Sequence, residues 1–351
     1  MSFSITALVP AHNEEQGLGD TLESLLAQTE PFDEIIVVDD CSTDRTWEVA
    51  LAYGVTVITP DSNQGSKAKA QNYGLASVRT DLVLPVDADT LLAPDYVELI
   101  KVPFRDGRVA VAAGCVQTRF ENTATERGRS IEYLFGFHFQ RPIQNAANSP
   151  VVCSGCCSAF RTDELRRFGG FPERTIVEDM DYTWSKQIEG RKAVYVGDAM
   201  AWAADPSDLK YLRKQVWRWM AGFFQNVRIH SRHMVRNKPL LLLWVLIAVW
   251  DILTAPLWYA MPFVLIFGMH QSVTVTLLWW AVAELVLLTP PLLYAARRRK
   301  LPYLRVMRNL PYVYLNKMVN VWYAWRALIV ELVAVPLKLT QGLCVYEKGR
   351  A

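Results

Sequence analysis

The feature that most constrains the fold of this chain is a change in hydropathy close to Asn237. Before it, apolar and polar residues alternate as in a water-soluble domain, whereas long apolar runs follow at about 239–267 and 274–295. A helix that crosses a bilayer needs roughly 20 mostly apolar residues, and both runs are long enough. The sequence therefore predicts three parts, namely a globular domain at 1–230, a membrane region at 231–345 and a tail at 346–351.

Charged residues beside the apolar runs orient the membrane region. Basic residues precede the first run at 228–238 and follow the second at 297–300. An excess of Lys and Arg marks the cytoplasmic ends of membrane spans. We therefore expect a multi-pass protein of the cell membrane, with the turn Met269–Ser272 outside. The first residues lack the basic start and long apolar core of a signal peptide, so the globular domain is expected in the cytoplasm.

Two further segments of the membrane region have mixed character. Residues 301–317 combine Arg, Lys and Tyr with apolar residues, which predicts an interfacial helix. A third apolar run at about 319–337 contains Arg326 and Glu331. It either spans the membrane with these charges paired or facing a polar path, or it is interfacial. We expect it to span.

The globular domain shows an alternation of strands and helices. Short apolar runs rich in β-branched residues occur at 4–10, 34–40, 55–59 and 82–89, and segments with helical spacing separate them. Short connections between alternating elements predict a parallel, doubly wound α/β sheet. The strands are continuously apolar, which fits a sheet covered on both faces. After Asp95 the alternation loosens.

Composition and motifs exclude several classes of function. The net charge is +2, and no basic stripe interleaved with aromatic residues is present, so nucleic-acid binding is not expected. The cluster Cys153, Cys156 and Cys157 has no second Cys or His pair at zinc-ligand spacing. A phosphate-binding G-x-x-x-x-G-K motif and a dinucleotide-binding G-x-G-x-x-G motif are both absent.

Polar side chains follow each of the predicted parallel strands. In an open α/β sheet, ligands bind beyond the carboxyl ends of the strands. One such residue alone would be explained as a turn or helix cap, but four strand ends with polar groups together indicate a binding site. The candidates are Pro10, Ala11, Asn13, Glu14, Asp39, Asp40, Lys67, Lys69, Asp87, Ala88 and Asp89.

The pair Asp87 and Asp89 forms a D-x-D motif at the end of an apolar strand. Carboxylate oxygens suit a hard cation, Mg²⁺ or Mn²⁺, which usually shares its coordination with substrate phosphates. A second acidic group, Glu178, Asp179 and Asp181, stands about 90 residues further on. A carboxylate at a helix start acts either as a general base near a reacting hydroxyl or as a simple partner of the helix dipole.

The segment QVWRW carries polar and aromatic residues at helical spacing. Gln215, Arg218, Trp219 and Gly222 fall at i, i+3, i+4 and i+7, so they share one face of a helix. The planar guanidinium of Arg suits a diphosphate, and a Trp suits the apolar face of a sugar ring. Trp217 points elsewhere, and we expect it to pack or to anchor the helix at the membrane.

In this order, VPAHNEE, VVDDCSTD, DAD, SGCCSAFR, VED and QVWRW resemble the motifs of family 2 glycosyltransferases over residues 4–230. More narrowly, they are similar to the processive membrane β-glycosyltransferases, which include cellulose, chitin and hyaluronan synthases. The resemblance implies a GT-A type fold, a Rossmann-like doubly wound sheet, followed by interfacial and transmembrane helices.

The resemblance also implies roles for individual residues. Asp39 or Asp40 would contact the uridine of a UDP-sugar, with Lys67 or Lys69 in the same nucleotide pocket. Asp87 would lie near the UDP, and Asp89 would bind the metal ion, Mg²⁺ or Mn²⁺. Asp179, beside Glu178, would be the catalytic base. Gln215, Arg218 and Trp219 would form a lid over UDP, with Trp219 beneath the acceptor sugar. Cys153, Ser154 and Gly155 would line the acceptor side.

We therefore expect a membrane-bound inverting glycosyltransferase that moves a sugar from a UDP-sugar to a growing glycan. One alternative is transfer of a single sugar to a polyprenyl phosphate or glycolipid, against which QVWRW argues. A remote alternative is a non-catalytic membrane scaffold, although Asp39, Asp87, Asp89 and Asp179 are all present. The expected partners are the donor, a glycan or lipid-linked acceptor, membrane lipids and, to complete a channel, further copies of the chain.

Overall fold

The computed structural model describes residues 3–339, so Cys344 and the tail expected at 346–351 lie outside the described residues. Its centre is an eight-stranded sheet in the order β3-β2-β1-β4-β7-β6-β8-β5. The strands are β1 (Ile5–Ala11), β2 (Glu34–Asp39), β3 (Thr56–Ile58), β4 (Leu82–Pro85), β5 (Thr90–Leu92), β6 (Val109–Thr118), β7 (Ser158–Arg161) and β8 (Lys192–Ala203).

The first four strands are parallel, as the sequence predicted, but the rest of the sheet is mixed. β1 pairs in parallel with β2 and β4, and β2 pairs in parallel with β3. β7 then runs antiparallel to both β4 and β6, while β8 is parallel to β6 and antiparallel to β5. The parallel prediction is therefore confirmed for β1–β4, and the mixed part of the sheet begins where the alternation of the sequence loosens.

Helices cover both faces of the parallel half, which explains its continuously apolar strands. On one face α1 (Leu18–Leu26) packs on alternate residues of β1, among them Ile5 and Val9. On the other face α3 (Lys67–Leu75) packs against Leu8. Successive side chains of a strand point to opposite faces, so one strand serves both layers. α2 (Thr46–Ala52), α4 (Tyr96–Lys101), α7 (Thr162–Phe168) and α8 (Glu178–Ile188) complete this domain.

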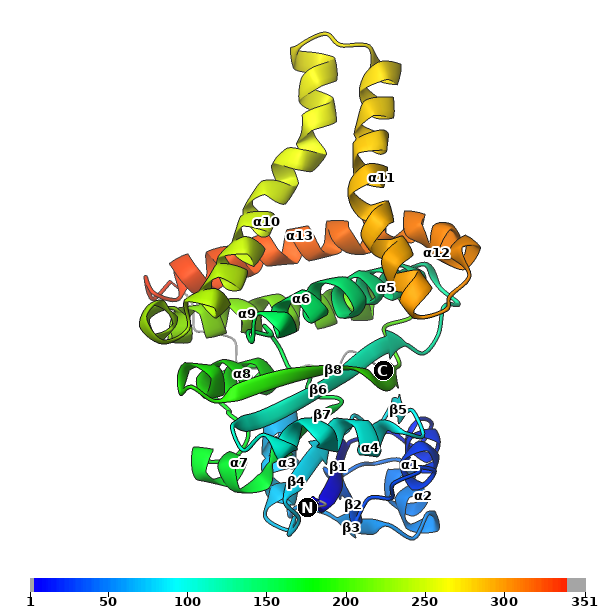
Figure 1. The fold of residues 1–351 in the computed structure, drawn as a ribbon, viewed down its shortest axis with the longest axis vertical. Coiled ribbons are helices and arrows are strands. Elements are labelled where there is room, and N and C mark those ends of the chain that lie inside the picture. Colours follow the sequence, from blue (N-terminus) through cyan, green and yellow to red (C-terminus); the bar gives the residue numbers. More distant parts are fainter. Residues whose placement is uncertain (1–2, 340–351) are drawn as a thin grey trace.

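A layer of helices lies between the sheet and the membrane region (Figure 1). It contains α5 (Ala124–Phe135), a π-helical turn (Gly136–Gln140), α6 (Arg141–Ala146) and α9 (Leu209–Asn237). α5 begins at a capping box, in which Thr123 and Glu126 satisfy each other's backbone N–H groups. α9 is 29 residues long and carries QVWRW, and it joins the domain with the sheet to the apolar half of the chain.

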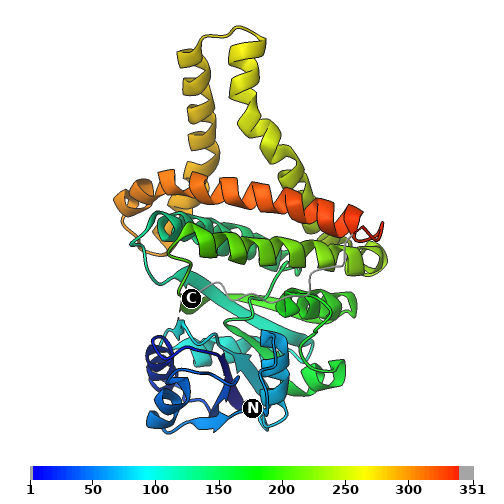
Figure 2. The same ribbon diagram turned by 180° about the vertical axis from the view of Figure 1, so that it is seen from behind.

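Two helices within residues 3–339 are long and apolar enough to cross a membrane, Pro239–Gly268 and Val273–Arg298. They are α10 (Pro239–Phe263), extended by a π-helical turn, and α11 (Val273–Arg298), which form a hairpin that projects away from the sheet (Figures 1 and 2). Large apolar side chains such as Leu257 and Phe267 are exposed along it. Such an exposed apolar surface suits lipid as its solvent.

The third apolar run lies across the base of the hairpin rather than beside it (Figure 2). The segments here are α12 (Tyr303–Asn309), a 3₁₀ turn (Leu310–Tyr312), α13 (Val313–Ile329) and a π-helical turn (Val330–Ala334). Its charges pair with α9, because Arg326 stacks on Trp217 at 4.6 Å and buried Glu331 accepts a hydrogen bond from Gln225 at 3.0 Å. The run thus lies across the hairpin base (Figure 2), and both of its charged side chains contact α9.

α13 also compensates for a proline inside α10. Pro256 has no N–H, so the carbonyl of Ile252, four residues earlier, loses its helical partner. The indole N–H of Trp325 donates to that carbonyl at 2.8 Å. This bond attaches the membrane hairpin to the helix beneath it.

Candidate active site

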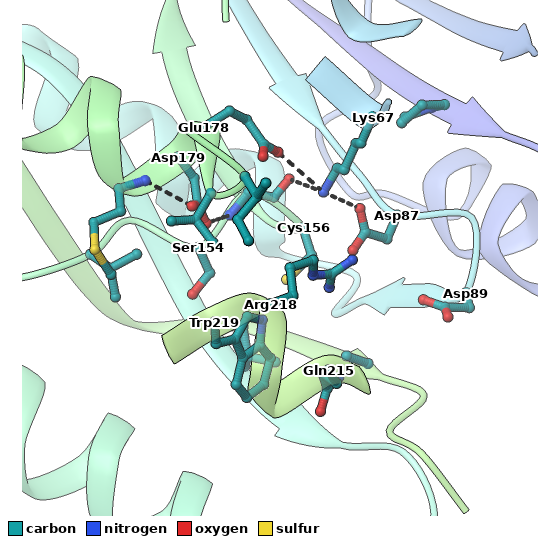
Figure 3. Close-up of a pocket in the computed structure, with 18 of the residues that line it drawn as sticks. Lys67, Asp87, Asp89, Ser154, Cys156, Glu178, Asp179, Gln215, Arg218 and Trp219 are labelled. Carbon is teal, nitrogen blue, oxygen red and sulfur yellow. Dashed lines mark hydrogen bonds and ion pairs between the residues drawn. The ribbon is translucent and has the colours of Figure 1, made fainter. Parts of the chain in front are cut away.

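A cavity of about 700 Å³ lies at the carboxyl ends of the parallel strands. Residues after β1, β2 and β4 all reach it, which is the location that an open α/β sheet favours for a ligand. QVWRW on α9 forms the facing wall (Figure 3). The predicted residues that line the cavity are Pro10, Ala11, Glu14, Asp40, Lys67, Asp87, Ala88, Asp89, Ser154, Gly155, Glu178, Asp179, Gln215, Arg218 and Trp219.

At one end of the cavity lie groups suited to a nucleotide. The side chain of Asp40 accepts the backbone N–H of Gln64 at 2.7 Å, while its backbone carbonyl lies 2.8 Å from Nδ1 of His12. Burial raises the pKa of Asp40 above its usual range. His12 and Asn63 also line the cavity, although His12 was not among the predicted candidates.

Four predicted residues do not line the cavity. Asp39 is buried and accepts the N–H of Ser42 at 3.2 Å, so it holds the turn after β2. The carbonyl oxygen of the Asn13 side chain accepts the N–H of Thr43 at 2.8 Å, which joins two neighbouring loops. The other two are Lys69, which is exposed, and Cys153, which is fully buried.

Lys67 connects the acids in the middle of the cavity. Its ammonium group forms an ion pair with Asp87, lies 3.8 Å from Glu178 and donates to the carbonyl of Gly155 at 3.3 Å (Figure 3). Lys67 begins α3, whose N-cap Ser66 accepts the N–H of Lys69. The D-x-D pair is therefore divided, because Asp87 pairs with a lysine while Asp89 stands further along the wall.

The described residues contain no cluster of three or more His, Cys, Asp or Glu side chains that would hold a metal ion by themselves. Mg²⁺ and similar hard cations, however, are often bound by one or two carboxylates together with substrate phosphates. Asp89 beside a cavity that suits a diphosphate fits this arrangement. The donor set therefore suits a cation shared between the protein and its ligand.

Asp179 is held by backbone groups at the start of α8. Its Oδ2 accepts the N–H of Gly155 at 2.7 Å, and its Oδ1 accepts the N–H of Met180 at 2.7 Å (Figure 3). A Cβ at Gly155 would lie 3.3 Å from Oε1 of Glu178, so the glycine permits this close approach. The carboxylate is thereby fixed in direction, as a general base needs to be.

Glu178, next to it, is buried. Burial raises the pKa of Glu178 above its usual value, the Lys67 ammonium acts in the opposite direction, and Asp179 raises the pKa further. Two adjacent acids at one helix start thus have different environments. Glu178 lies against the lysine, whereas Asp179 is held by N–H groups.

Three of the four residues on the polar face of QVWRW line the cavity, and Gly222 does not. Arg218 extends from α9 toward Asp87, and the ring of Trp219 forms the adjacent wall (Figure 3). Gly222 does not leave a gap for a ligand, because a Cβ there would lie 2.4 Å from Val177. It allows α9 to pack closely on the residue that precedes Glu178. Trp217 packs away from the cavity against α13.

A buried arginine on α5, which sequence reasoning did not single out, supports this motif. Arg129 donates to the side-chain oxygen of Gln215 at 2.9 Å, and its guanidinium lies 4.8 Å from the ring centre of Trp219. It also forms an ion pair with Glu132 at 2.7 Å and lies 3.6 Å from Asp205. The contacts hold two residues of the cavity wall in fixed orientations.

The lining of the cavity changes from polar to apolar. Ser154 and Gly155, which were predicted for the acceptor side, line the cavity, and Cys156 lies beside them. Beyond them the lining becomes apolar and is formed by Ile176, Met180, Met220, Phe223, Ala248 and Ile252. The last two belong to α10. Sequence reasoning missed them because the apolar pattern of that helix indicated only a membrane span.

Comparison with known proteins agrees with this geometry. The acid-lined cavity lies at the strand ends of an α/β sheet and faces α9, as in a GT-A type fold. The family model described as Glycosyl transferase family 2 matches residues 6–169 of the chain.

Two curated relatives are polysaccharide synthases by name. A hyaluronan synthase of Streptococcus pyogenes is 30% identical over 268 residues, which cover 70% of this chain and 63% of that protein. A poly-beta-1,6-N-acetyl-D-glucosamine synthase of Staphylococcus aureus is 28% identical over 225 residues, covering 62% and 54%. The chain thus spans less than two thirds of the length of these relatives.

The fold itself has a counterpart among solved structures. Mannosyltransferase PcManGT from Pyrobaculum calidifontis, described in complex with GDP-Man and Mn²⁺, superimposes with a TM-score of 0.63. The sequences are 21% identical, and the match covers 92% of this chain and 88% of that one. The agreement extends over the helical layer and hairpin as well as the sheet.

Proposed function

We propose that the protein is a membrane-bound inverting glycosyltransferase that moves a sugar from a UDP-sugar to a growing glycan. The observation that carries this proposal is the position of Asp179 in the same cavity as Arg218 and Trp219. A base, a cation for a diphosphate and a ring for a sugar are the three elements that such a transfer needs. The two related synthases support the glycan product.

The donor would lie with its nucleotide near Asp40 and His12 and its diphosphate near Arg218. Planar guanidinium groups bind phosphate oxygens through two parallel hydrogen bonds. As the bond between the anomeric carbon and UDP breaks, its electron pair passes to the diphosphate oxygen. Arg218 stabilises the negative charge that develops there. Lys67, which pairs with Asp87, would keep the neighbouring acids from repelling the diphosphate.

The acceptor hydroxyl would attack the anomeric carbon from the side opposite to UDP. Asp179 takes the proton of that hydroxyl as the new carbon–oxygen bond forms, and later releases it to water. One displacement of this kind inverts the anomeric configuration and requires no covalent enzyme intermediate. Trp219 lies where a sugar ring could stack on its indole face.

A divalent cation, Mg²⁺ or Mn²⁺, would be held by Asp89, with Asp87 in support, together with the diphosphate. When bound, it would neutralise charge on the leaving UDP. The Mn²⁺ named for the mannosyltransferase is consistent with this assignment. It leaves open which of the two metals is the natural one, because both prefer oxygen ligands.

The membrane arrangement follows from the hairpin. α10 and α11 would cross the cell membrane, with Met269–Ser272 outside and the catalytic domain in the cytoplasm. α12 and α13 would lie along the inner surface, since they run across the hairpin base (Figure 2). Assembly of several copies of the chain could complete a channel for the glycan.

A second candidate, transfer of a single sugar to a polyprenyl phosphate or glycolipid, is favoured by the apolar end of the cavity. Incubation of the purified protein with individual labelled UDP-sugars, followed by sizing of the products, separates the two. Release of UDP with products of many lengths supports the first, and a single added sugar supports the second. No turnover with any UDP-sugar would contradict both and favour a non-catalytic scaffold.

A further inference from the structure

The apolar end of the cavity is built by three elements from different parts of the chain. Ile176 and Met180 flank the start of α8, Met220 and Phe223 lie on α9, and Ile252 lies on α10. These side chains pack on one hydrophobic cluster that joins the domain to the base of the hairpin. The cavity thus runs from the catalytic acids to a helix of membrane-spanning length.

The contribution of α10 is an ordered surface. Ala248 and Ile252 are four residues apart, so they lie one turn apart on the same side of the helix. The carbonyl of Ile252 is held by Trp325 of α13 at 2.8 Å. This part of the wall is therefore fixed by a specific contact, although many side chains further along the same helix are exposed.

The chemistry of this lining discriminates between occupants. A glycan carries hydroxyl groups, and each one that leaves water without a hydrogen-bond partner is costly. The six side chains at this end are Ile, Met, Met, Phe, Ala and Ile, none of which is a strong donor or acceptor. A hydrocarbon chain has no polar groups that would lose hydrogen bonds there, and its transfer from water to an apolar surface is favourable.

Asp179 indicates which chemical group of the occupant lies at the polar end of the cavity. A phosphate monoester loses its second proton near pH 6, so its oxygen needs no base at neutral pH. A sugar hydroxyl does need one, and the Asp179 carboxylate, which two backbone N–H groups fix at 2.7 Å, lines the cavity. The base therefore points to a hydroxyl rather than to a lipid phosphate.

We propose that the acceptor is a glycolipid, whose sugar hydroxyl lies at Asp179 and whose hydrocarbon chain lies along the apolar end of the cavity between α8, α9 and α10. This inference rests on the proposed glycosyl transfer and names its acceptor. The glycolipid would come from the membrane that contains the hairpin. It applies whether the lipid carries one sugar or a growing glycan.

The test uses the full chain in nanodiscs, with the UDP-sugar that gives turnover and with ethyl and octyl glycosides of glucose and N-acetylglucosamine as acceptors. Each buried methylene strengthens binding by about fourfold, so kcat/KM is expected to be at least about 100-fold higher for the octyl compound. Partition into the lipid also favours long chains, and a matched pair of variants removes that contribution.

Ile252→Trp fills the apolar end, whereas Leu253→Trp alters the next residue, which faces away from the cavity. We expect the octyl-to-ethyl ratio of kcat/KM to fall at least tenfold in Ile252→Trp and to stay unchanged in Leu253→Trp. Equal ratios in the two variants and the wild type would overturn the inference. Transfer to ethyl and octyl glycosides with equal kcat/KM would also overturn the inference but would leave the proposed function intact. No transfer to any acceptor would contradict the proposed function itself.

Discussion

Arg129 on α5 donates a hydrogen bond to the side-chain oxygen of Gln215 on α9 at a distance of 2.9 Å. The same guanidinium pairs with Glu132, whose other oxygen accepts the amide of Asn320 on α13 at 2.7 Å. Three helices thus meet at one buried charge. The wall of the cavity is thereby connected to the helix that supports the membrane hairpin.

Arg129→Lys is expected to reduce kcat/KM at least about tenfold. Lysine keeps the charge but loses the planar fork that contacts Glu132 and Gln215 together, and a hydrogen bond to a charged group contributes about 1.5–3 kcal/mol. Steady-state kinetics measures the loss, and thermal unfolding checks that the protein stays folded. Arg127→Lys, on the same helix but outside the cavity, is the control. An equal loss in both variants would contradict a positioning role.

Asp179→Asn is expected to lower kcat by about 10²- to 10⁴-fold, the usual contribution of a general base. The amide keeps an oxygen for one backbone N–H but does not take a proton. Donor affinity, measured by titration with UDP-sugar, should remain within a few-fold of wild type. Asp163→Asn, an exposed acid, serves as the control. Parallel loss of donor binding would assign Asp179 to the donor instead.

Asp89→Asn is expected to raise the Mn²⁺ or Mg²⁺ concentration needed for half-maximal activity by at least about 100-fold, since even residues behind the ligands commonly contribute 10–100-fold. EDTA should abolish wild-type activity, and added metal should restore it. Asp95→Asn, exposed at the start of α4, should behave like the wild type. Full activity in EDTA would show that the reaction proceeds without a metal ion.

Glu178→Gln is expected to remove a pH dependence of stability. Burial raises the native pKa of Glu178 above its ordinary value of 4.5, so the native chain keeps this proton longer than the unfolded chain. Wild-type stability therefore falls as pH rises from about 4.5 through the native pKa. The thermal midpoint of the variant relative to that of the wild type should therefore rise between pH 4.5 and pH 7. The same difference for the variant Glu98→Gln, at an exposed residue, should stay constant. A constant difference would mean that Glu178 titrates normally.

Trp325→Phe is expected to destabilise the protein by about 0.5–1.5 kcal/mol, because the carbonyl of Ile252 would lose the partly buried hydrogen bond that replaces the one missing at Pro256. Chemical or thermal unfolding in detergent measures the change. Trp322→Phe, on the same helix with an indole that is 70% exposed, is the matched control. Equal midpoints for the two variants would show that water replaces the indole N–H.

Much of the site followed from local spacing. Asp40, Asp87 and Asp89 were found because a parallel sheet gathers the ends of its strands at one edge, wherever those strands occur in the chain. Gln215, Arg218 and Trp219 were found because 3.6 residues per turn place them on one face. These inferences need only the type of element, which periodicity reveals.

The surroundings of other residues depend on tertiary contacts that local spacing does not reveal. Neighbouring residues such as Asp39 and Asp40 carry the same chemistry, and only the direction of the turn separates the one that reaches the cavity. Gly222 shared the cavity-facing stripe, yet its role depends on Val177, which is distant in the chain. Helical spacing shows which residues share one face of a helix, but it does not show which other segments pack against each of them.

The sequence by itself determined the element types, the edge of the sheet where ligands bind, the acids and the helix that face them, and the two apolar spans. The tertiary structure alone decided that α13 crosses the hairpin base, that Arg129 supports Gln215 and that the cavity reaches Ile252. These features join residues such as Glu132 and Asn320, which are 188 positions apart. Local periodicity fixes what each segment becomes, but which segments meet depends on packing and pairing over the whole chain.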